Sequence, residues 1–258
     1  MTSTPRGTAA RRRTRSAGWI PNQHGAWFMV TIPPLVALAF APSWLGVATT
    51  FTWLCGYFAF FAATVWLRAR RASRQLPPVL TYTALTALAG IITVLIDAHQ
   101  LRWVPVIAPL AAIAIWETYQ RRPRSLLSGV VTVAASGLMV PVVAGASPKS
   151  WAMAAIFVGY FVGTVPYVKT MIRNRGQRSW LWGSIGFHVF LVGAAAWGTW
   201  VWPGSQLISP WVVVVAAIAL ARAIIMPLLS VRGQRPLAPK YVGGIDALIS
   251  IAVVWAAW

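Results

Sequence analysis

Long apolar stretches separated by short polar ones make up most of this sequence. A helix needs about 20 mainly apolar residues to cross a hydrocarbon core of roughly 30 Å. Nine stretches reach about that length, and prolines inside them are compatible with membrane helices, which they kink without breaking. We therefore expect an all-α polytopic membrane bundle of about nine transmembrane helices. The predicted segments are residues 24–42, 45–67, 77–96, 102–119, 125–146, 150–170, 180–200, 209–230 and 241–258.

Basic residues gather at alternate ends of these predicted segments. Nineteen of the 22 Lys and Arg residues fall in five short clusters, and the chain between consecutive clusters is long enough to cross a membrane twice. Because cytoplasmic loops carry an excess of Lys and Arg, we expect a cytoplasmic amino terminus and an external carboxyl terminus. The clusters are Arg6/Arg11/Arg12/Arg13/Arg15, Arg68/Arg70/Arg71/Arg74, Arg121/Arg122/Arg124, Lys169/Arg173/Arg175/Arg178 and Arg232/Arg235/Lys240.

The composition supports the same class of protein. Of the 258 residues, 58% are hydrophobic and 10% are charged, which leaves too little polar surface to cover a soluble globular protein. A net charge of +19 would suit a nucleic-acid partner, but the cations punctuate apolar segments instead of lining one folded face. The expected partners are therefore membrane lipids, chiefly anionic ones, which basic loops attract by about 1 kcal/mol per residue, and not nucleic acid.

The first 18 residues differ from the rest of the chain, being rich in Arg and without apolar periodicity. We expect residues 1–18 to form a disordered basic cytoplasmic tail and residues 19–258 to form the transmembrane domain. A basic stretch before an apolar one also resembles a signal peptide. The Pro33–Pro34 pair interrupts the apolar region that a signal peptide requires, so cleavage is not expected.

Cysteine and histidine spacing predicts no metal centre. Cys55 is the one cysteine of the chain, which excludes an intramolecular disulfide. His24, His99 and His188 lie far apart and lack the paired spacing of a zinc site. We expect neither a metal nor a cofactor.

Two ionisable residues occur inside the last two predicted segments, Arg222 and Asp246. A charged side chain near the middle of a membrane helix costs about 2.5 to 3.5 kcal/mol, so Arg222 requires a partner. Both segments leave the same loop, and counting outward from it brings the two residues to similar depths. We predict that they form an ion pair, which serves either to lock the two helices together or to bind a ligand.

Two further polar residues lie in apolar surroundings. His188 falls near the middle of the seventh segment, where a neutral imidazole hydrogen-bonded across helices is favoured over a proton relay. Glu117 precedes Arg121 by four residues, a spacing that predicts an ion pair on one face of a helix. A catalytic acid is the alternative role for Glu117.

Two short motifs are candidate binding elements. Gln23 and His24 precede a glycine at the start of the first segment, where another helix or a ligand can approach closely. Tyr167, Lys169 and Arg173 close the sixth segment. Because Lys169 and Arg173 are four apart, they share a helix face and can clamp a phosphate or carboxylate; ordinary loop charge is the alternative.

Three of these stretches together resemble a known family. The run from Pro21 to Trp27 (PNQHGAW), the element Pro166 to Lys169 (PYVK) and the stretch Lys240 to Gly243 (KYVG) are similar to the YwiC-like bacterial membrane proteins. The resemblance spans residues 20–258. It implies an integral protein of the bacterial cell (inner) membrane, and it assigns no catalytic residue.

The arrangement of the predicted segments also resembles the UbiA-type prenyltransferases, whose loops after the second and sixth helices carry Asp-rich motifs that bind magnesium and a prenyl diphosphate. The corresponding stretches here, residues 66–71 and 169–175, contain Arg70, Arg71 and other cations but no aspartate. Magnesium prefers carboxylate ligands, so magnesium-dependent prenyl transfer in its usual form is not expected. Arg and Lys can still bind a diphosphate directly.

Three functions remain open at this point. The first is binding, and possible processing, of an anionic amphipathic or isoprenoid-type lipid at the cytoplasmic side. The second is a small-solute permease whose pathway includes His188, Arg222 and Asp246, although the repeat symmetry typical of transporters is not evident. The third is a non-catalytic subunit of a membrane complex.

Overall fold

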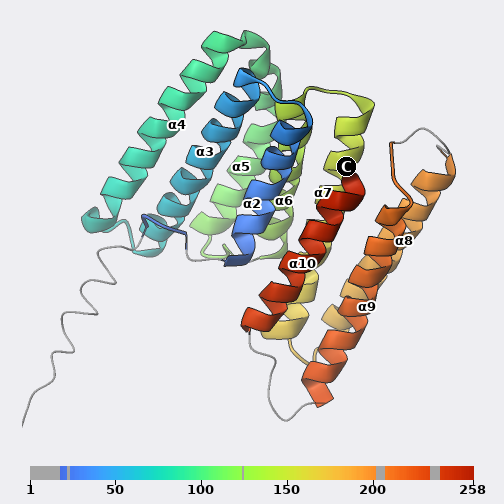
Figure 1. Ribbon diagram of the computed structural model, residues 1–258. Helices are drawn as coiled ribbons and strands as arrows, with labels where there is room; N and C mark the ends of the chain where they lie inside the picture. The colour runs from blue at the N-terminus through green and yellow to red at the C-terminus, as the bar shows by residue number, and fades with distance from the viewer. Residues whose placement is uncertain (1–17, 22–23, 124, 202–206, 233–238) are drawn as a thin grey trace, which may run out of the picture.

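The computed structural model describes residues 18–21, 24–123, 125–201, 207–232 and 239–258. Within these ranges the chain forms nine α-helices, two short 3-10 helices and no strand (Figure 1). The 3-10 helices, η1 (Ser73–Gln75) and η2 (Ala98–Trp103), directly precede α4 and α5. The α-helices are α2 (His24–Phe40), α3 (Trp44–Arg68), α4 (Leu76–Ile96), α5 (Val104–Tyr119), α6 (Leu126–Ala144), α7 (Pro148–Ile172), α8 (Arg178–Val201), α9 (Trp211–Arg232) and α10 (Pro239–Ala257).

The predicted all-α architecture is confirmed, and each helix begins and ends within two residues of its predicted bounds. Seven helical segments are long and apolar enough to span a membrane, and Ala26–Phe40 and Tyr241–Ala257 are shorter apolar helices. The fold is therefore that of a multi-pass membrane protein. The side of the membrane on which each terminus lies stays a prediction, and the predicted tail, residues 1–18, lies almost wholly outside the described residues.

Serine side chains fix the start of three helices. Ser43, Ser125 and Ser147 each accept a hydrogen bond from a backbone N–H in the first turn of α3, α6 and α7. Such caps satisfy amide donors that have no partner inside the helix. They explain why the apolar segments become separate helices at these points rather than continuing through the loops.

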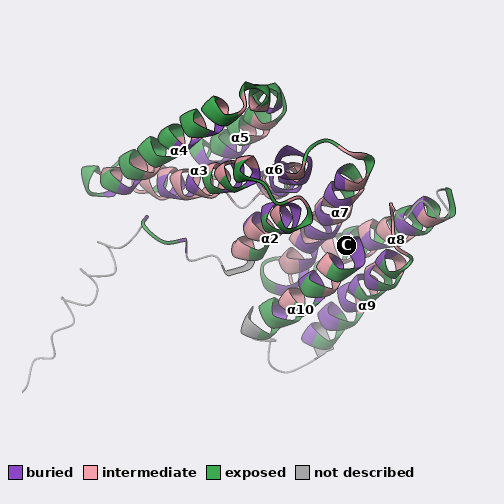
Figure 2. Ribbon diagram, turned by 45° about the horizontal axis from the view of Figure 1, so that its top comes forward, coloured by how far each residue is buried: buried purple, intermediate pink, exposed green. Residues whose placement is uncertain are grey.

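Three helices occupy the middle of the bundle. α2, α6 and α7 pack against one another, α3, α4 and α5 lie on one side of them, and α8, α9 and α10 lie on the other (Figures 1 and 2). Val140 of α6 and Phe157 of α7 are fully buried there. By contrast, α4 turns large apolar side chains outward, and Leu95 is 80% exposed. Such a surface suits a lipid environment.

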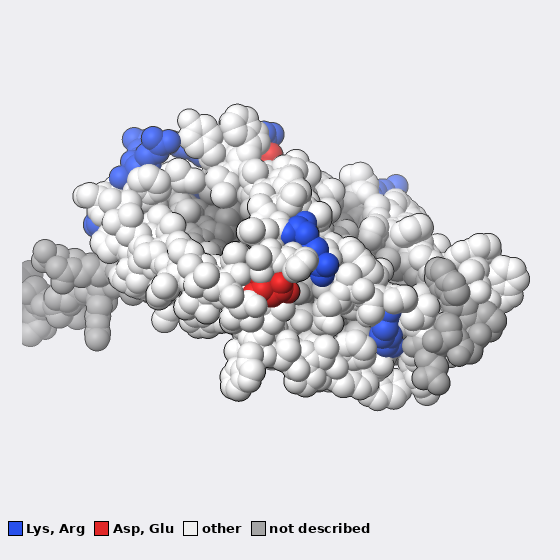
Figure 3. Space-filling model, turned by 90° about the horizontal axis from the view of Figure 1, so that it is seen from above, with Lys and Arg blue, Asp and Glu red and all other residues white. Residues whose placement is uncertain are grey.

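The two ends of the bundle differ in charge. The connections α3–α4, α5–α6 and α7–α8 lie at the lower end in Figure 1, which we call the basic end because residues 68–74, 121–122 and 169–178 supply its cations. The opposite end, seen from above in Figure 3, is mostly uncharged, and Asp97, Arg102 and Lys149 lie near it. The backbone N–H of His99 donates to Asp97 at 2.9 Å, which holds the pKa of this carboxyl below its ordinary value.

Close packing of α6 on α7 depends on Gly137. A Cβ added there would lie 2.2 Å from Val158 Cγ2 and 3.4 Å from the Ala154 carbonyl oxygen. We expect Gly137→Ala to destabilise the protein by about 1–3 kcal/mol through overpacking, seen as a lower thermal unfolding temperature in detergent. Gly186→Ala is the matched control, because a Cβ there meets no atom within 4 Å. Equal unfolding temperatures for the two variants would contradict the prediction.

Candidate functional site

A large hollow lies between α2, α3, α6 and α7. Its volume is about 720 Å³. Aromatic and aliphatic side chains form most of its wall, and hydroxyl groups are interspersed among them. The apolar lining includes Met29, Val30, Tyr57, Phe60, Phe61, Val133, Val165 and Val168, and the hydroxyl groups belong to Thr64, Ser125, Ser128, Thr132 and Thr164.

The hydroxyl groups of this wall are mostly engaged within their own helices. Thr64 donates to the Phe60 carbonyl at 2.9 Å, and Thr132 donates to the Ser128 carbonyl at 2.7 Å. Satisfied in this way, they do not require a polar ligand. The wall therefore behaves as a largely apolar surface.

A second hollow of about 520 Å³ adjoins the first at the basic end. Both are lined by Pro123, Ser125 and Arg173, so the two hollows adjoin, and we call them together the groove. The mouth of the groove is the part lined by cations. They are Arg68, Arg121, Arg122, Lys169 and Arg173.

Helix ends bring these cations together. α3 ends at Arg68, and Arg70 and Arg71 follow with positive φ of 54° and 59°. α5 ends at Tyr119, and Arg121 has a φ of 59°. A left-handed residue stops a helix and reverses the chain, so the last turn of each helix stays at the mouth.

Of the two residues expected to bind phosphate after the second segment, neither lines the groove. The Arg71 guanidinium instead lies 6.0 Å from the ring centres of Trp66 and of Tyr119. Arg68 takes the place expected for Arg70 and Arg71, because the helix continues as far as Arg68 and turns away after it. Lys169 and Arg173, expected from their four-residue spacing to share a helix face, both line the groove.

Charge at the mouth is strongly positive. The chain has three acidic residues, and Glu117 is the one at this end. The predicted Glu117–Arg121 pair is wrong: Glu117 is buried and lies 3.7 Å from Arg122 instead. The helix ends before Arg121, so the four-residue spacing no longer places both side chains on one face.

The Lys169 ammonium group also contacts an aromatic ring: its Nζ lies 4.7 Å from the Trp180 ring centre.

The predicted ion pair between Arg222 and Asp246 is present, and it joins α9 to α10. The Arg222 side chain is 3% exposed and the Asp246 side chain 20%. The guanidinium carbon lies 4.0 Å from the Tyr167 ring centre and 5.8 Å from that of Tyr160. Two tyrosine faces of α7 thus share in solvating the buried cation.

Hydrogen bonds tie α7 further to this pair. The Tyr160 hydroxyl donates to the Asp246 backbone carbonyl at 3.1 Å, and the Ser250 hydroxyl donates to the same carbonyl at 2.7 Å. The Tyr167 hydroxyl lies 3.0 Å from Met226 Sδ. Tyr167, expected as a binding residue of the same motif as Lys169, therefore faces the ion pair and does not line the groove.

His188 lies beside the same stretch of α7. Its Nδ1 is 2.8 Å from the Ser184 carbonyl of its own helix, so the expected bond across helices is replaced by one within α8. A Cβ on Gly163 would lie 3.1 Å from His188 Nε2. A side chain at 163 would therefore require the imidazole to move away from α7 by a few tenths of an ångström.

Comparison with known proteins finds a family to which part of the chain is similar. The family model described as YwiC-like protein matches residues 20–144. The Bacillus subtilis uncharacterised protein YwiC is 27% identical over 185 residues, which cover 67% of this chain and 74% of the relative. Over these residues the chain is similar to the YwiC-like family. A Haemophilus influenzae uncharacterised protein is 23% identical over 182 residues, covering 66% and 74%, and no solved structure matches.

The YwiC-like match covers α2 to α6, which supply three of the four helices around the groove. The match also includes the motif at Gln23 and His24. Gln23 lies outside the described residues, and His24 is described only as the first backbone position of α2. Ala26, two residues further on, lines the groove, so α2 begins next to it. No group of three or more metal-ligating side chains occurs among the described residues.

Proposed function

We propose that this protein binds an anionic amphipathic lipid, of acyl or isoprenoid type, in the groove. One observation carries the proposal: a largely apolar hollow between helices adjoins a second hollow, and five cations line the two where they meet the basic end. The tail would lie among α2, α3, α6 and α7, and the phosphate or carboxylate headgroup would lie on the arginines and Lys169. The setting is the bacterial cell membrane, which fits the bacterial relatives.

The two parts of the groove contribute differently to binding. A lipid tail leaves one apolar environment for another, so the tail gains packing but little hydrophobic free energy. The headgroup gains charge-assisted hydrogen bonds, and arginine can make them in pairs to phosphate or carboxylate. Affinity and headgroup selectivity therefore depend on the cations of the mouth. The apolar wall determines which shapes of tail the groove accepts.

Direct recognition by cations replaces metal-mediated recognition in this proposal. No carboxylate other than Glu117 lies at the basic end, and Glu117 is paired with Arg122. A magnesium ion there would lack its preferred oxygen ligands. We therefore propose lipid binding without the magnesium-dependent prenyl transfer of UbiA-type enzymes.

The experiment that tests the function is removal of two mouth charges. We expect Arg68→Gln/Arg173→Gln to lower the amount of anionic lipid that copurifies with the protein by about 30-fold, since each cation contributes about 1 kcal/mol. Mass spectrometry of the retained lipids, relative to phosphatidylethanolamine, is the measurement.

Arg74→Gln/Arg178→Gln is the matched control, because it removes the same charge at the same end from residues that do not line the groove. Wild-type protein without enriched anionic lipid, or equal loss in the two double variants, would refute lipid binding in the groove.

A further inference from the structure

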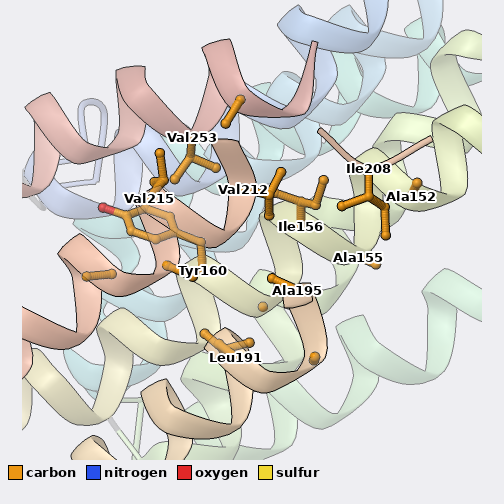
Figure 4. A pocket seen from close by; sticks show the side chains of 15 residues that line it. Ala152, Ala155, Ile156, Tyr160, Leu191, Ala195, Ile208, Val212, Val215 and Val253 are labelled. Carbon is orange, nitrogen blue, oxygen red and sulfur yellow. The ribbon is translucent and has the colours of Figure 1, made fainter. Parts of the chain in front are cut away.

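A small apolar well opens between α7, α8, α9 and α10, on the other side of α7 from the groove (Figure 4). Its volume is about 150 Å³, and small side chains such as Ala155 and Ala216 line it. Tyr160 is the one side chain of its lining with a polar atom. The well is therefore suited to a molecule of a few carbon atoms.

The ion pair lies on the same two helices as the lining of the well, α9 and α10, and close to it along each helix. Val215 and Ala219 line the well, and Arg222 is the next residue on the same face of α9. Asp246 lies two turns before Val253, which also lines the well, on α10. Tyr160 lies between: its hydroxyl bonds to the Asp246 carbonyl, and its ring is 5.8 Å from the guanidinium carbon.

Arg222 has donors that this pair does not use. Its Nη1 donates to Asp246, whereas Nε and Nη2 are buried and have no partner among the described residues. Two adjacent N–H groups of a planar guanidinium match the two oxygens of a carboxylate. Leaving such donors unpaired in the interior is unfavourable, so this arrangement favours a second, exogenous carboxylate.

We propose that Arg222 is a binding site for a small monocarboxylate, which passes through the well and lies on the Nε and Nη2 edge after the Tyr160 side chain rotates. Among the described residues, the Tyr160 hydroxyl is held by a 3.1 Å bond to the Asp246 carbonyl and a 3.5 Å contact with the Ser250 hydroxyl. Rotation therefore costs these two contacts, together with the packing of the ring on Phe161 and on the Arg222 guanidinium. This site is separate from the groove and does not depend on lipid binding.

Charge balance requires that a proton bind together with the anion. Arg222 and Asp246 cancel, so a second carboxylate would leave excess negative charge in a low-dielectric interior. Asp246, the more exposed partner, takes up one proton when the anion binds. The other titratable groups facing the pair are Tyr160 and Tyr167 of α7 and His188 of α8, and the described side chains of α2 include none. Binding is therefore stronger at lower pH.

Equilibrium binding of radiolabelled propionate to the purified protein tests the site. We expect saturable binding that is tighter at about pH 6 than at about pH 8 and that propionamide, its uncharged analogue, does not displace. Ala216→Leu, which fills the well, should weaken binding about tenfold or more. Ala217→Leu is the matched control, because Ala217 is exposed on α9 and does not line the well.

Arg222→Leu/Asp246→Leu removes the donors together with the carboxylate and should abolish propionate binding. Absence of saturable binding to the wild type, displacement by propionamide, or unchanged binding in either the Ala216 variant or the double variant would overturn the proposal. Loss of lipid retention in mouth variants, with propionate binding intact, would show that the two sites are independent.

Discussion

Arg222→Leu alone is expected to destabilise the protein by about 3–5 kcal/mol, because it leaves the Asp246 carboxylate in the interior without its cation. The Asp246 carboxylate accepts from Arg222, and the hydroxyls of Tyr160 and Ser250 reach only the Asp246 backbone carbonyl. Among the described residues, no neighbouring donor is thus in place to compensate. The measurement is the thermal unfolding temperature in detergent, together with the yield of folded protein.

The double variant Arg222→Leu/Asp246→Leu distinguishes two causes of destabilisation: loss of the contact between the helices and burial of an unpaired carboxylate. Replacing a whole buried ion pair by apolar side chains of similar size is often neutral or stabilising. We therefore expect the double variant to recover most of the stability that the single variant loses. A single variant as stable as the wild type, or a double variant no better than the single, would show that the pair does not link α9 to α10.

Much of the fold is predictable because membrane helices obey few rules. The length of an apolar stretch and the position of basic loops predict the segments, and the structure follows them to within two residues. The Arg222–Asp246 pair follows from the same physics. A lone arginine in a membrane helix requires an anion, and the neighbouring helix of the hairpin supplies one.

The groove is less predictable because it depends on how helices end. Helical spacing placed Lys169 and Arg173 on one face, and both line the groove. The same reasoning fails for Glu117 and Arg121, because a left-handed residue at 121 ends the periodicity between them. Arg68 contributes to the mouth for the same reason: it is the last residue of α3 before the chain turns.

α7 is the element that both candidate sites share. Val165, Val168 and Lys169 face the groove, whereas Tyr160 and Tyr167 face the ion pair. These two sets lie on different faces of one helix. The sequence alone does not show which α7 residues belong to which face, because nearly every residue around the polar positions is apolar. Assigning the faces requires knowing which helices pack on each side of α7.

Thr132→Trp is expected to reduce the retained lipid by about 100-fold, a change of about 2.7 kcal/mol. Thr132 lines the groove from α6, and its hydroxyl bonds only within its own helix. An indole ring there would occupy the space proposed for the tail while leaving every cation of the mouth in place. The measurement is again mass spectrometry of lipids that copurify with the protein.

Thr132→Val is the control, since it removes the hydroxyl without adding volume and should retain lipid as the wild type does. The Thr132→Trp variant also distinguishes binding of a lipid from binding of a soluble phosphate. If the mouth binds only a free anion, Thr132→Trp leaves inorganic phosphate binding unchanged, and the wild type retains no lipid. Normal lipid retention by a folded Thr132→Trp protein would place the tail elsewhere, because the groove cannot hold both an indole and a lipid chain at this position.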